Sequence, residues 1–167
     1  INTRITAATV QALRGEGRPY RGVLYPGLMI TDEGPRVVEY NCRLGDPETQ
    51  VILPRLQSDL LPMLLAAVRG DLSSTTAAWS DDACVGVVVA SGGYPASYDT
   101  GRPISGLGAV DADVLVFHAG TAASDGGAVT AGGRVLTVVA RGATIAAARE
   151  RVYDNVRRIT FAGAHYR

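Results

Sequence analysis

The chain contains no lysine, and all 16 of its basic side chains are arginine. A P-loop nucleotide site needs a lysine that reaches the β- and γ-phosphates, so the composition excludes such a site. Schiff-base catalysis is excluded for the same reason, because the reactive imine forms on a lysine amine. Arginine is therefore the only side chain in this sequence with a permanent positive charge.

The chain also lacks an excess of either charge, since 16 acidic side chains bring the formal net charge to zero. A surface that neutralises many phosphates is not expected, so we expect no nucleic-acid partner. The two cysteines, Cys42 and Cys84, show no paired ligand spacing and imply no disulfide framework, which favours a reducing cytoplasm. No apolar run reaches transmembrane length and no signal-peptide pattern is present, so we expect no membrane partner.

A chain of 167 residues that is 47% hydrophobic can form one compact domain or two small ones. In its first part, apolar periodicity and turn residues predict a helix over residues 3–14, strands over 21–30 and 35–41, and a helix from Ser58 or Asp59 to Gly70. Eight apolar side chains are predicted to face inward from these helices: Ile5, Ala8, Ala12, Leu13, Met63, Leu64, Ala67 and Val68.

Residues 71–82 form a Ser-, Thr- and Ala-rich loop that marks the expected boundary between two domains, 1–78 and 79–167. Beyond it the sequence predicts short strands at 83–91, 114–119, 128–131 and 134–141. A final helix, capped by Thr144, carries one apolar stripe: Ile145, Ala148, Val152, Val156 and Ile159. The fold class is therefore α+β, with a helix–hairpin–helix unit followed by a β-rich module.

The second predicted strand carries the residues best suited to chemistry. Side chains two apart in a strand share a face, so Glu39, Asn41 and Arg43 point the same way if the strand persists to Arg43. A carboxylate and an amide oxygen can hold Mg²⁺ against a triphosphate, and an arginine can stabilise a transferred phosphoryl group. The spacing alone, because the pattern is short, favours an edge strand whose polar side chains face water over a metal site. If Glu39 and Asn41 hold a metal ion, their side-chain oxygens should converge in an open groove.

Three other features favour structural roles. The run Ser91–Pro95 is glycine-rich but does not open a helix, which indicates a turn. His118 has no nearby ligand-type partner and is predicted to be partly buried and hydrogen-bonded. Cys42 should point away from Asn41 into the core, where it could not act as a nucleophile.

Seven stretches of the sequence match one enzyme family in the family's order: 20–29, 39–50, 53–56, 90–95, 101–106, 117–121 and 132–136. The runs Gly45-Asp-Pro-Glu-Thr-Gln50 and Ser91-Gly-Gly-Tyr-Pro95 are the most specific of them. On these stretches the chain resembles the C-terminal portion of the glycinamide ribonucleotide synthetases (phosphoribosylamine–glycine ligases), which are ATP-grasp enzymes of purine biosynthesis.

The resemblance implies that Glu39 and Asn41 hold Mg²⁺ or Mn²⁺ together with ATP, and that Arg43 acts in phosphoryl transfer. It also implies that Asp46, Pro47 and Glu48 line the place of glycine or of the phosphoribosylamine amine. Residues 1–78 would then be the C-terminal part of the ATP-grasp domain with its metal site, and 79–167 the family's C-terminal β-rich domain. Many other ATP-grasp enzymes carry a further carboxylate on the preceding strand. Here that position falls near Gly27 or Leu28, so the metal would be bound mainly through ATP.

The partners implied are ATP, glycine, 5-phosphoribosylamine and the N-terminal domains of the same protein, in a monomer. The chain opens without methionine and stops without a helix cap, so we expect a fragment that is inactive alone. Two alternatives remain open at this point. One is an ATP-grasp carboxylase of the purine or biotin-dependent type, although the 45–50 run points away from it. The other is a binding or scaffolding module without catalysis.

Overall fold

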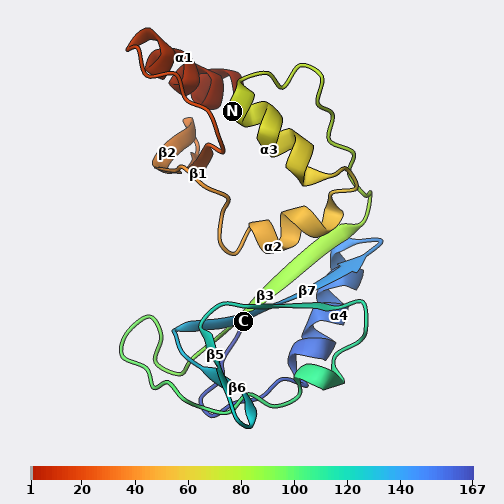
Figure 1. Cartoon of the computed structure of the whole chain (residues 1–167). Coiled ribbons are helices and arrows are strands. Elements are labelled where there is room, and N and C mark those ends of the chain that lie inside the picture. The colour runs from red at the N-terminus through yellow and green to blue at the C-terminus, as the bar shows by residue number, and fades with distance from the viewer. Residues whose placement is uncertain (1) are drawn as a thin grey trace. The chain divides into compact units, whose positions relative to one another are not determined.

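The computed structural model describes residues 2–167, which form two compact units (Figure 1). One unit takes in the chain up to Glu48 together with Leu56–Trp79, and the other takes in Thr49–Arg55 and Ser80–Arg167. The main division thus follows Trp79, but the segment 49–55 groups with the second unit, which the sequence pattern did not indicate. No helix among residues 2–167 combines the length and the apolar content that a membrane span needs.

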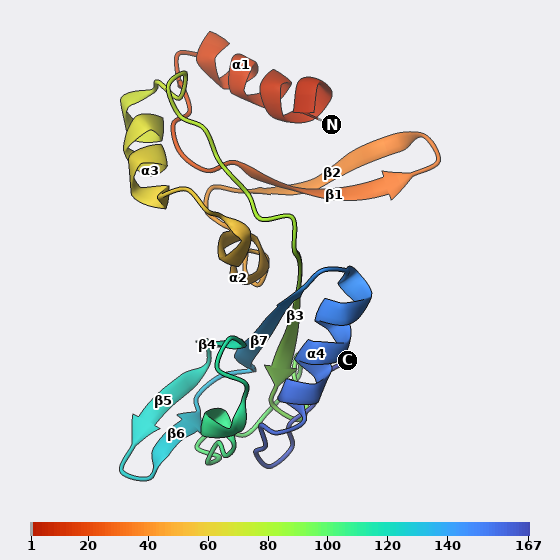
Figure 2. The ribbon, with the colours of Figure 1, turned by 90° about the vertical axis from the view of Figure 1, so that its right-hand side faces the viewer.

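The first unit contains a π-helical turn, two α-helices and a hairpin: η1 (Asn2–Thr6), α1 (Ala7–Gly15), β1 (Tyr25–Thr31), β2 (Gly34–Asn41) and α3 (Leu60–Arg69). The antiparallel hairpin closes at the pair Thr31 and Gly34, and Gly34 has a φ of 103°, a conformation that favours glycine. Figure 2 shows β1 and β2 as a two-stranded ribbon with no third strand beside them. The first strand begins at Tyr25, four residues later than the sequence predicts.

Both ends of α3 are capped as expected. The Asp59 carboxylate accepts a hydrogen bond from the Leu61 N–H at 2.9 Å, and Gly70 ends the helix in the left-handed conformation with a φ of 77°. Ser58, the alternative cap, instead accepts a hydrogen bond from the Ala78 N–H at 2.8 Å. The serine therefore fastens the loop that follows α3.

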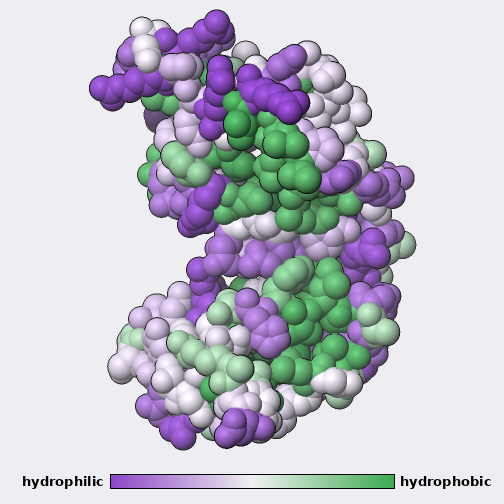
Figure 3. Space-filling view, viewed as in Figure 1, coloured by the Kyte–Doolittle hydropathy of each residue, from purple (hydrophilic) through white to green (hydrophobic). Residues whose placement is uncertain are grey.

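The first unit buries less apolar surface than the sequence predicts. Ile5 is the only hydrophobic side chain of its described part that is buried, and it is still 9% exposed, whereas Ala8 and Ala12 are exposed. Leu64 and Val68 of α3 were predicted to face inward and are also exposed, Val68 to 68%. A helix that is apolar on all sides needs cover on more than one side, and this unit covers only part of α3. Figure 3 shows the resulting hydrophobic surface around α3.

The second unit combines a three-stranded antiparallel sheet, in the order β3-β7-β4, with a separate β5–β6 hairpin and two helices. Its elements are α2 (Thr49–Ile52), the 3₁₀ turn η2 (Leu53–Arg55), β3 (Ala83–Ala90), the 3₁₀ turn η3 (Leu107–Ala109), β4 (Leu115–His118), β5 (Thr121–Ser124), β6 (Gly127–Thr130), β7 (Arg134–Gly142) and α4 (Ile145–Val156). The sequence did not predict β5, because Thr-Ala-Ala-Ser has little strand propensity of its own.

The central strand β7 is covered on both faces. Val138 and Ala140 belong to the core beneath α4, which lies along β3 and β7 in Figures 1 and 2. On the other face, Val51 of α2 lies against β3 at Gly86, where an added Cβ would come within 2.7 Å of the valine Cγ1. This close approach is the physical reason that 49–55 groups with the second unit.

The predicted stripe of α4 is confirmed for Ala148, Val152 and Val156, and for Ile159 just beyond the helix, all of which are buried in the β-rich unit. It is wrong for Ile145, which is 72% exposed. Ile145 is the first residue after the cap, where helical side chains point back beyond the helix end and so past the edge of the sheet. The cap itself is confirmed, since the Thr144 hydroxyl accepts a hydrogen bond from the Ala147 N–H at 3.1 Å.

A fully buried asparagine on α4 fixes the loop before β4. Asn155 accepts a hydrogen bond from the Asp111 backbone N–H at 2.8 Å, and its Nδ2 donates to the Asp111 carboxylate at 3.1 Å and to the Arg151 carbonyl at 3.0 Å. Arg158 donates to the same carboxylate at 2.7 Å. The Asn155 bond first, and the Arg158 bond second, hold the pKa of Asp111 below its usual value.

Replacing the asparagine should weaken the fold. Asn155→Ala leaves the Asp111 N–H and carboxylate without these partners, and we expect it to lower the free energy of unfolding by roughly 1–3 kcal/mol. Urea unfolding of the chain measures the change. Asp154→Asn is the matched control, because it removes only an exposed ion pair with Arg157 on the same helix. Equal stability of the two variants would contradict the structural role of Asn155.

The Asp111 carboxylate should also make stability depend on pH. Its pKa is lower in the folded than in the unfolded chain, so its charged form stabilises the fold above about pH 4, the ordinary aspartate value, and this contribution is lost as pH falls through the lowered folded pKa. The urea midpoint of Asp111→Asn should therefore lie below that of the unaltered chain at neutral pH and approach it in acid. A difference that stays constant from neutral to acidic pH would contradict this assignment.

Candidate functional site

The β2 strand places Glu39 and Asn41 side by side. The Asn41 Nδ2 donates a hydrogen bond to the Glu39 Oε1 at 3.0 Å, which confirms that the two side chains share a face. Glu39 is exposed and Asn41 is half-buried, so neither is packed in a core. Asn41 turns its amide nitrogen rather than its oxygen toward the carboxylate, and a half-turn of the amide would present two oxygens to the same point.

The partner strand makes room for the carboxylate. In the hairpin ladder, Gly27 pairs with Glu39 and Tyr25 pairs with Asn41, with a bulge between Gly27 and Leu28. The position opposite Glu39 is therefore Gly27, one of the two positions, Gly27 or Leu28, near which the missing carboxylate of other ATP-grasp enzymes was expected to fall. A Cβ at Gly27 would lie 3.1 Å from the Glu39 Cγ, so the glycine lets the glutamate side chain lie close to the ladder.

The structure corrects two expectations about the residues that follow. The strand ends at Asn41, so strand alternation does not reach Arg43, which lies in a bend and donates to the neighbouring Leu44 carbonyl at 2.9 Å. Cys42 is exposed and does not enter a core. Its interaction with Tyr20 is the main cause of a raised pKa of that tyrosine, whose hydroxyl donates to the Val23 carbonyl at 2.7 Å.

The loop after Arg43 is folded tightly. Gly45 is buried, and the Glu48 side chain lies across it, because a Cβ at Gly45 would come within 2.4 Å of the Glu48 Oε2. Burial raises the pKa of Tyr25, and the negative charge of Glu48 and the hydrogen bond to it add to the effect. The peptide bond between Asp46 and Pro47 is cis, with Asp46 exposed and Pro47 half-buried.

These residues fit a divalent ion with few protein ligands. An exposed carboxylate and an adjacent amide are the hard oxygen donors that Mg²⁺ or Mn²⁺ prefers. No group of three or more His, Cys, Asp or Glu side chains among residues 2–167 could hold a metal ion. Glu39 and Asn41 would therefore supply two ligands, and the phosphate oxygens of a nucleotide would have to supply others.

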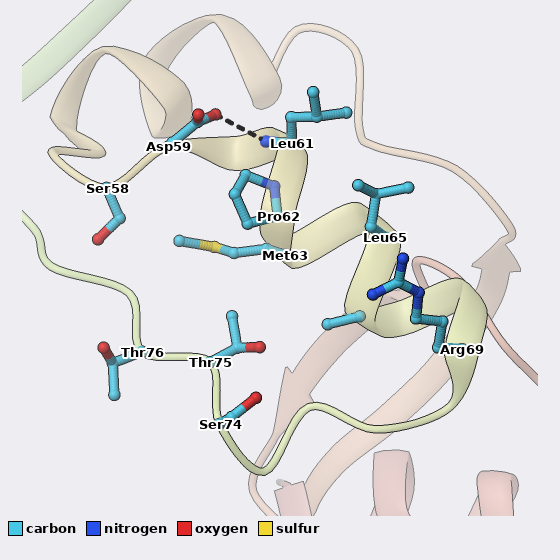
Figure 4. A pocket seen from close by; sticks show the side chains of 11 residues that line it. Ser58, Asp59, Leu61, Pro62, Met63, Leu65, Arg69, Ser74, Thr75 and Thr76 are labelled. Carbon is cyan, nitrogen blue, oxygen red and sulfur yellow. Dashed lines mark hydrogen bonds between the residues drawn. The ribbon is translucent and has the colours of Figure 1, made fainter.

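A pocket of 530 Å³ lies elsewhere in the first unit, between α3 and the segment 74–76 (Figure 4). Leu61, Pro62 and Leu65 form its apolar side, and the hydroxyls of Ser74, Thr75 and Thr76 lie opposite. Glu39, Asn41 and Arg43 do not line it. The pocket is the uncovered side of an apolar helix, and no group of the Glu39–Asn41 site contributes to it.

The other sequence candidates prove structural. Residues 91–95 form the predicted turn, in which the Ser91 hydroxyl donates to the Gly132 carbonyl at 2.9 Å and the Tyr94 ring covers Gly133. His118 is hydrogen-bonded as expected, through Nδ1 to the Thr121 hydroxyl at 3.0 Å, but it is exposed rather than partly buried. It ends a short edge strand whose last side chain faces solvent.

Comparison with known proteins decides the family. Residues 84–167 match the model of the phosphoribosylglycinamide synthetase C domain, and residues 1–49 match that of the ATP-grasp (A) domain of the same enzymes. The chain belongs to the phosphoribosylglycinamide synthetase family. The hairpin with Glu39 and Asn41 falls in the A-domain match, and the β3-β7-β4 sheet falls in the C-domain match.

Relatives within the family are similar over almost all of this chain. A phosphoribosylamine–glycine ligase of Rhizobium meliloti is 48% identical over 98% of the chain, and one of Allochromatium vinosum is 50% identical over all of it. The crystal structure of the Thermotoga maritima phosphoribosylamine–glycine ligase covers 94% of the chain with a TM-score of 0.81 at 38% identity. The chain spans 38–40% of the length of these proteins.

Sequence reasoning missed two residues of this site. Tyr25 and Gly27 lie in the stretch 20–29 that carries the family resemblance, but their roles depend on the hairpin partner that each one faces. The signal that could have identified Tyr25 and Gly27 is the register of the β1–β2 hairpin, which places both residues beside the Glu39–Asn41 pair.

Proposed function

We propose that the whole protein joins glycine to 5-phosphoribosylamine at the expense of ATP, giving glycinamide ribonucleotide, ADP and phosphate. The proposal is supported by the family membership and by the names of the longer relatives, which are phosphoribosylamine–glycine ligases. The observation that carries it is the adjacent pair of Glu39 and Asn41 on β2, followed directly by the Arg43 loop. That arrangement suits an ATP-dependent transfer of a phosphoryl group.

In this mechanism, the glycine carboxylate takes the γ-phosphoryl group of ATP, and the amine then displaces phosphate from the acyl phosphate to form the amide. Glu39 and Asn41 would hold Mg²⁺ or Mn²⁺, which when bound neutralises charge on the phosphate oxygens. The exposed Arg43 guanidinium would leave the Leu44 carbonyl and bind the transferred group through two parallel N–H donors. Asp46, Pro47 and Glu48 would border the glycine or the amine.

The chain supplies only part of such a site. It has no lysine for the phosphates, and the outer half of the hairpin exposes apolar side chains, including Met29, Ile30 and Val38. Apolar surface exposed on this scale usually marks an interface. We infer that the N-terminal part of the enzyme packs on this hairpin and on α3, and that it contributes the remaining phosphate contacts.

In the whole enzyme, Glu39→Gln and Asn41→Ala should each lower kcat about 100-fold, with a smaller change in the KM for ATP, because charge stabilisation matters most in the transition state. Arg43→Lys should also lower kcat, since an ammonium cannot form two parallel hydrogen bonds. Glycine-dependent release of ADP in the presence of phosphoribosylamine is the assay. Glu33→Gln, an exposed carboxylate at the hairpin turn, is the matched control. ATP cleavage that needs bicarbonate instead of glycine would identify a carboxylase and overturn the proposal.

The isolated chain should bind Mg-ATP only weakly, with a dissociation constant above about 1 mM. Two metal ligands without a lysine or a closing loop leave most phosphate oxygens without a protein partner. Isothermal titration of the 167-residue chain measures the affinity, with Glu39→Gln as the comparison. Tight, magnesium-dependent binding that this variant loses would show that the site is complete within the chain.

A further inference from the structure

A glycine within β1 lies against the first of the two candidate metal ligands. Gly27 pairs with Glu39 in the hairpin ladder, and a Cβ at Gly27 would lie 3.1 Å from the Glu39 Cγ and 3.8 Å from its Oε1. Glycine weakens the interior of a strand, and its φ is not positive here, so neither strand propensity nor backbone conformation accounts for it. The space that the Glu39 side chain occupies does account for it.

The hairpin also changes its register at this glycine. Gly27 pairs with Glu39 and Leu28 pairs with Val37, so the register passes over Val38. A bulge of this kind bends the strand and changes the direction in which nearby side chains point. The bulge and the glycine therefore act on the same side chain, that of Glu39.

The conformation of the Glu39 side chain decides whether the two ligands lie together. Its Oε1 accepts a hydrogen bond from the Asn41 Nδ2 at 3.0 Å. Because the ladder holds the main chain of both strands, a methyl group at position 27 would be accommodated by rotation of the Glu39 side chain about its Cα–Cβ bond. Staggered rotamers lie about 120° apart, so this rotation would carry the carboxylate away from Asn41.

We propose that Gly27 is a positioning residue, which leaves the space in which the Glu39 carboxylate lies beside Asn41 before a metal–nucleotide complex binds. This inference rests on the proposed function, in which Glu39 and Asn41 are the metal ligands. Ligands arranged in advance do not have to lose their conformational freedom when the complex binds. A side chain at position 27 would displace the first ligand, while Asn41, which pairs with Tyr25, would keep its place on β2.

Nuclear magnetic resonance of the 167-residue chain tests the contact without an assay of activity. The reporter is the side-chain amide of Asn41, and Glu39→Ala gives its resonance position when the hydrogen bond is removed. In Gly27→Ala, this resonance should move most of the way to its position in Glu39→Ala. Gly15→Ala is the matched control and should leave the resonance in place, since the φ of Gly15 is not positive and a Cβ there would meet no neighbour within 4 Å among the described residues.

Two results on the isolated chain would overturn the proposal. One is an Asn41 resonance that stays in place in Gly27→Ala or that moves equally in Gly15→Ala. The other is faster backbone amide exchange along the whole hairpin, residues 25–41, in Gly27→Ala. The glycine would then serve the pairing of the strands and not the placement of one side chain.

In the whole enzyme, Gly27→Ala should lower kcat about tenfold and change the KM for ATP by less than about twofold, because the metal ligands act most strongly in the transition state. If the glycine acts through Glu39, adding Gly27→Ala to the Glu39→Gln enzyme should lower kcat by less than about twofold further. An unchanged kcat, or a loss of about tenfold in both backgrounds, would overturn the proposal. Failure of the unaltered enzyme to turn over glycine would overturn the proposed function instead, and the Asn41 resonance would still decide whether Gly27 positions the carboxylate.

Discussion

The backbone ladder between β1 and β2 sets the geometry of the whole candidate site. Its register puts Gly27 opposite Glu39 and Tyr25 opposite Asn41, so one strand carries the acidic and amide side chains while the other makes room for them and supports them. A slip of one residue would turn Glu39 and Asn41 to the opposite face. The precision of the site therefore comes from main-chain hydrogen bonds, and not from a dense core, which this unit lacks.

Local sequence signals predicted the elements that local physics controls. The caps at Asp59 and Thr144 and the shared face of Glu39 and Asn41 follow from interactions within a few residues, and the structure confirms them. The buried face of α4 was also readable, except at its first turn. Features that depend on distant partners were not readable, among them β5, which exists because β6 pairs with it.

The exposure of Leu64, Val68 and Cys42 has the same origin. The periodicity of a sequence predicts which face of a helix is apolar. It does not indicate whether the residues that pack against this face belong to the same stretch of chain. In the second unit the cover is local, because α4 follows β7 directly and packs on it. In the first unit no neighbouring element of the described chain covers all of α3, and its side chains Leu64 and Val68 remain exposed to solvent.

The contact of Val51 with Gly86 has a consequence for how the chain can be divided. The backbone passes from one unit to the other after Glu48, Arg55 and Trp79, so three chain crossings, and not a single linker, connect the two units. A single cut in the loop 71–82 releases a β-rich piece without α2, and Gly86 of the edge strand β3 then loses the Val51 side chain that lies against it. If the second unit were transferred to another protein as a module, α2 would have to be included with it.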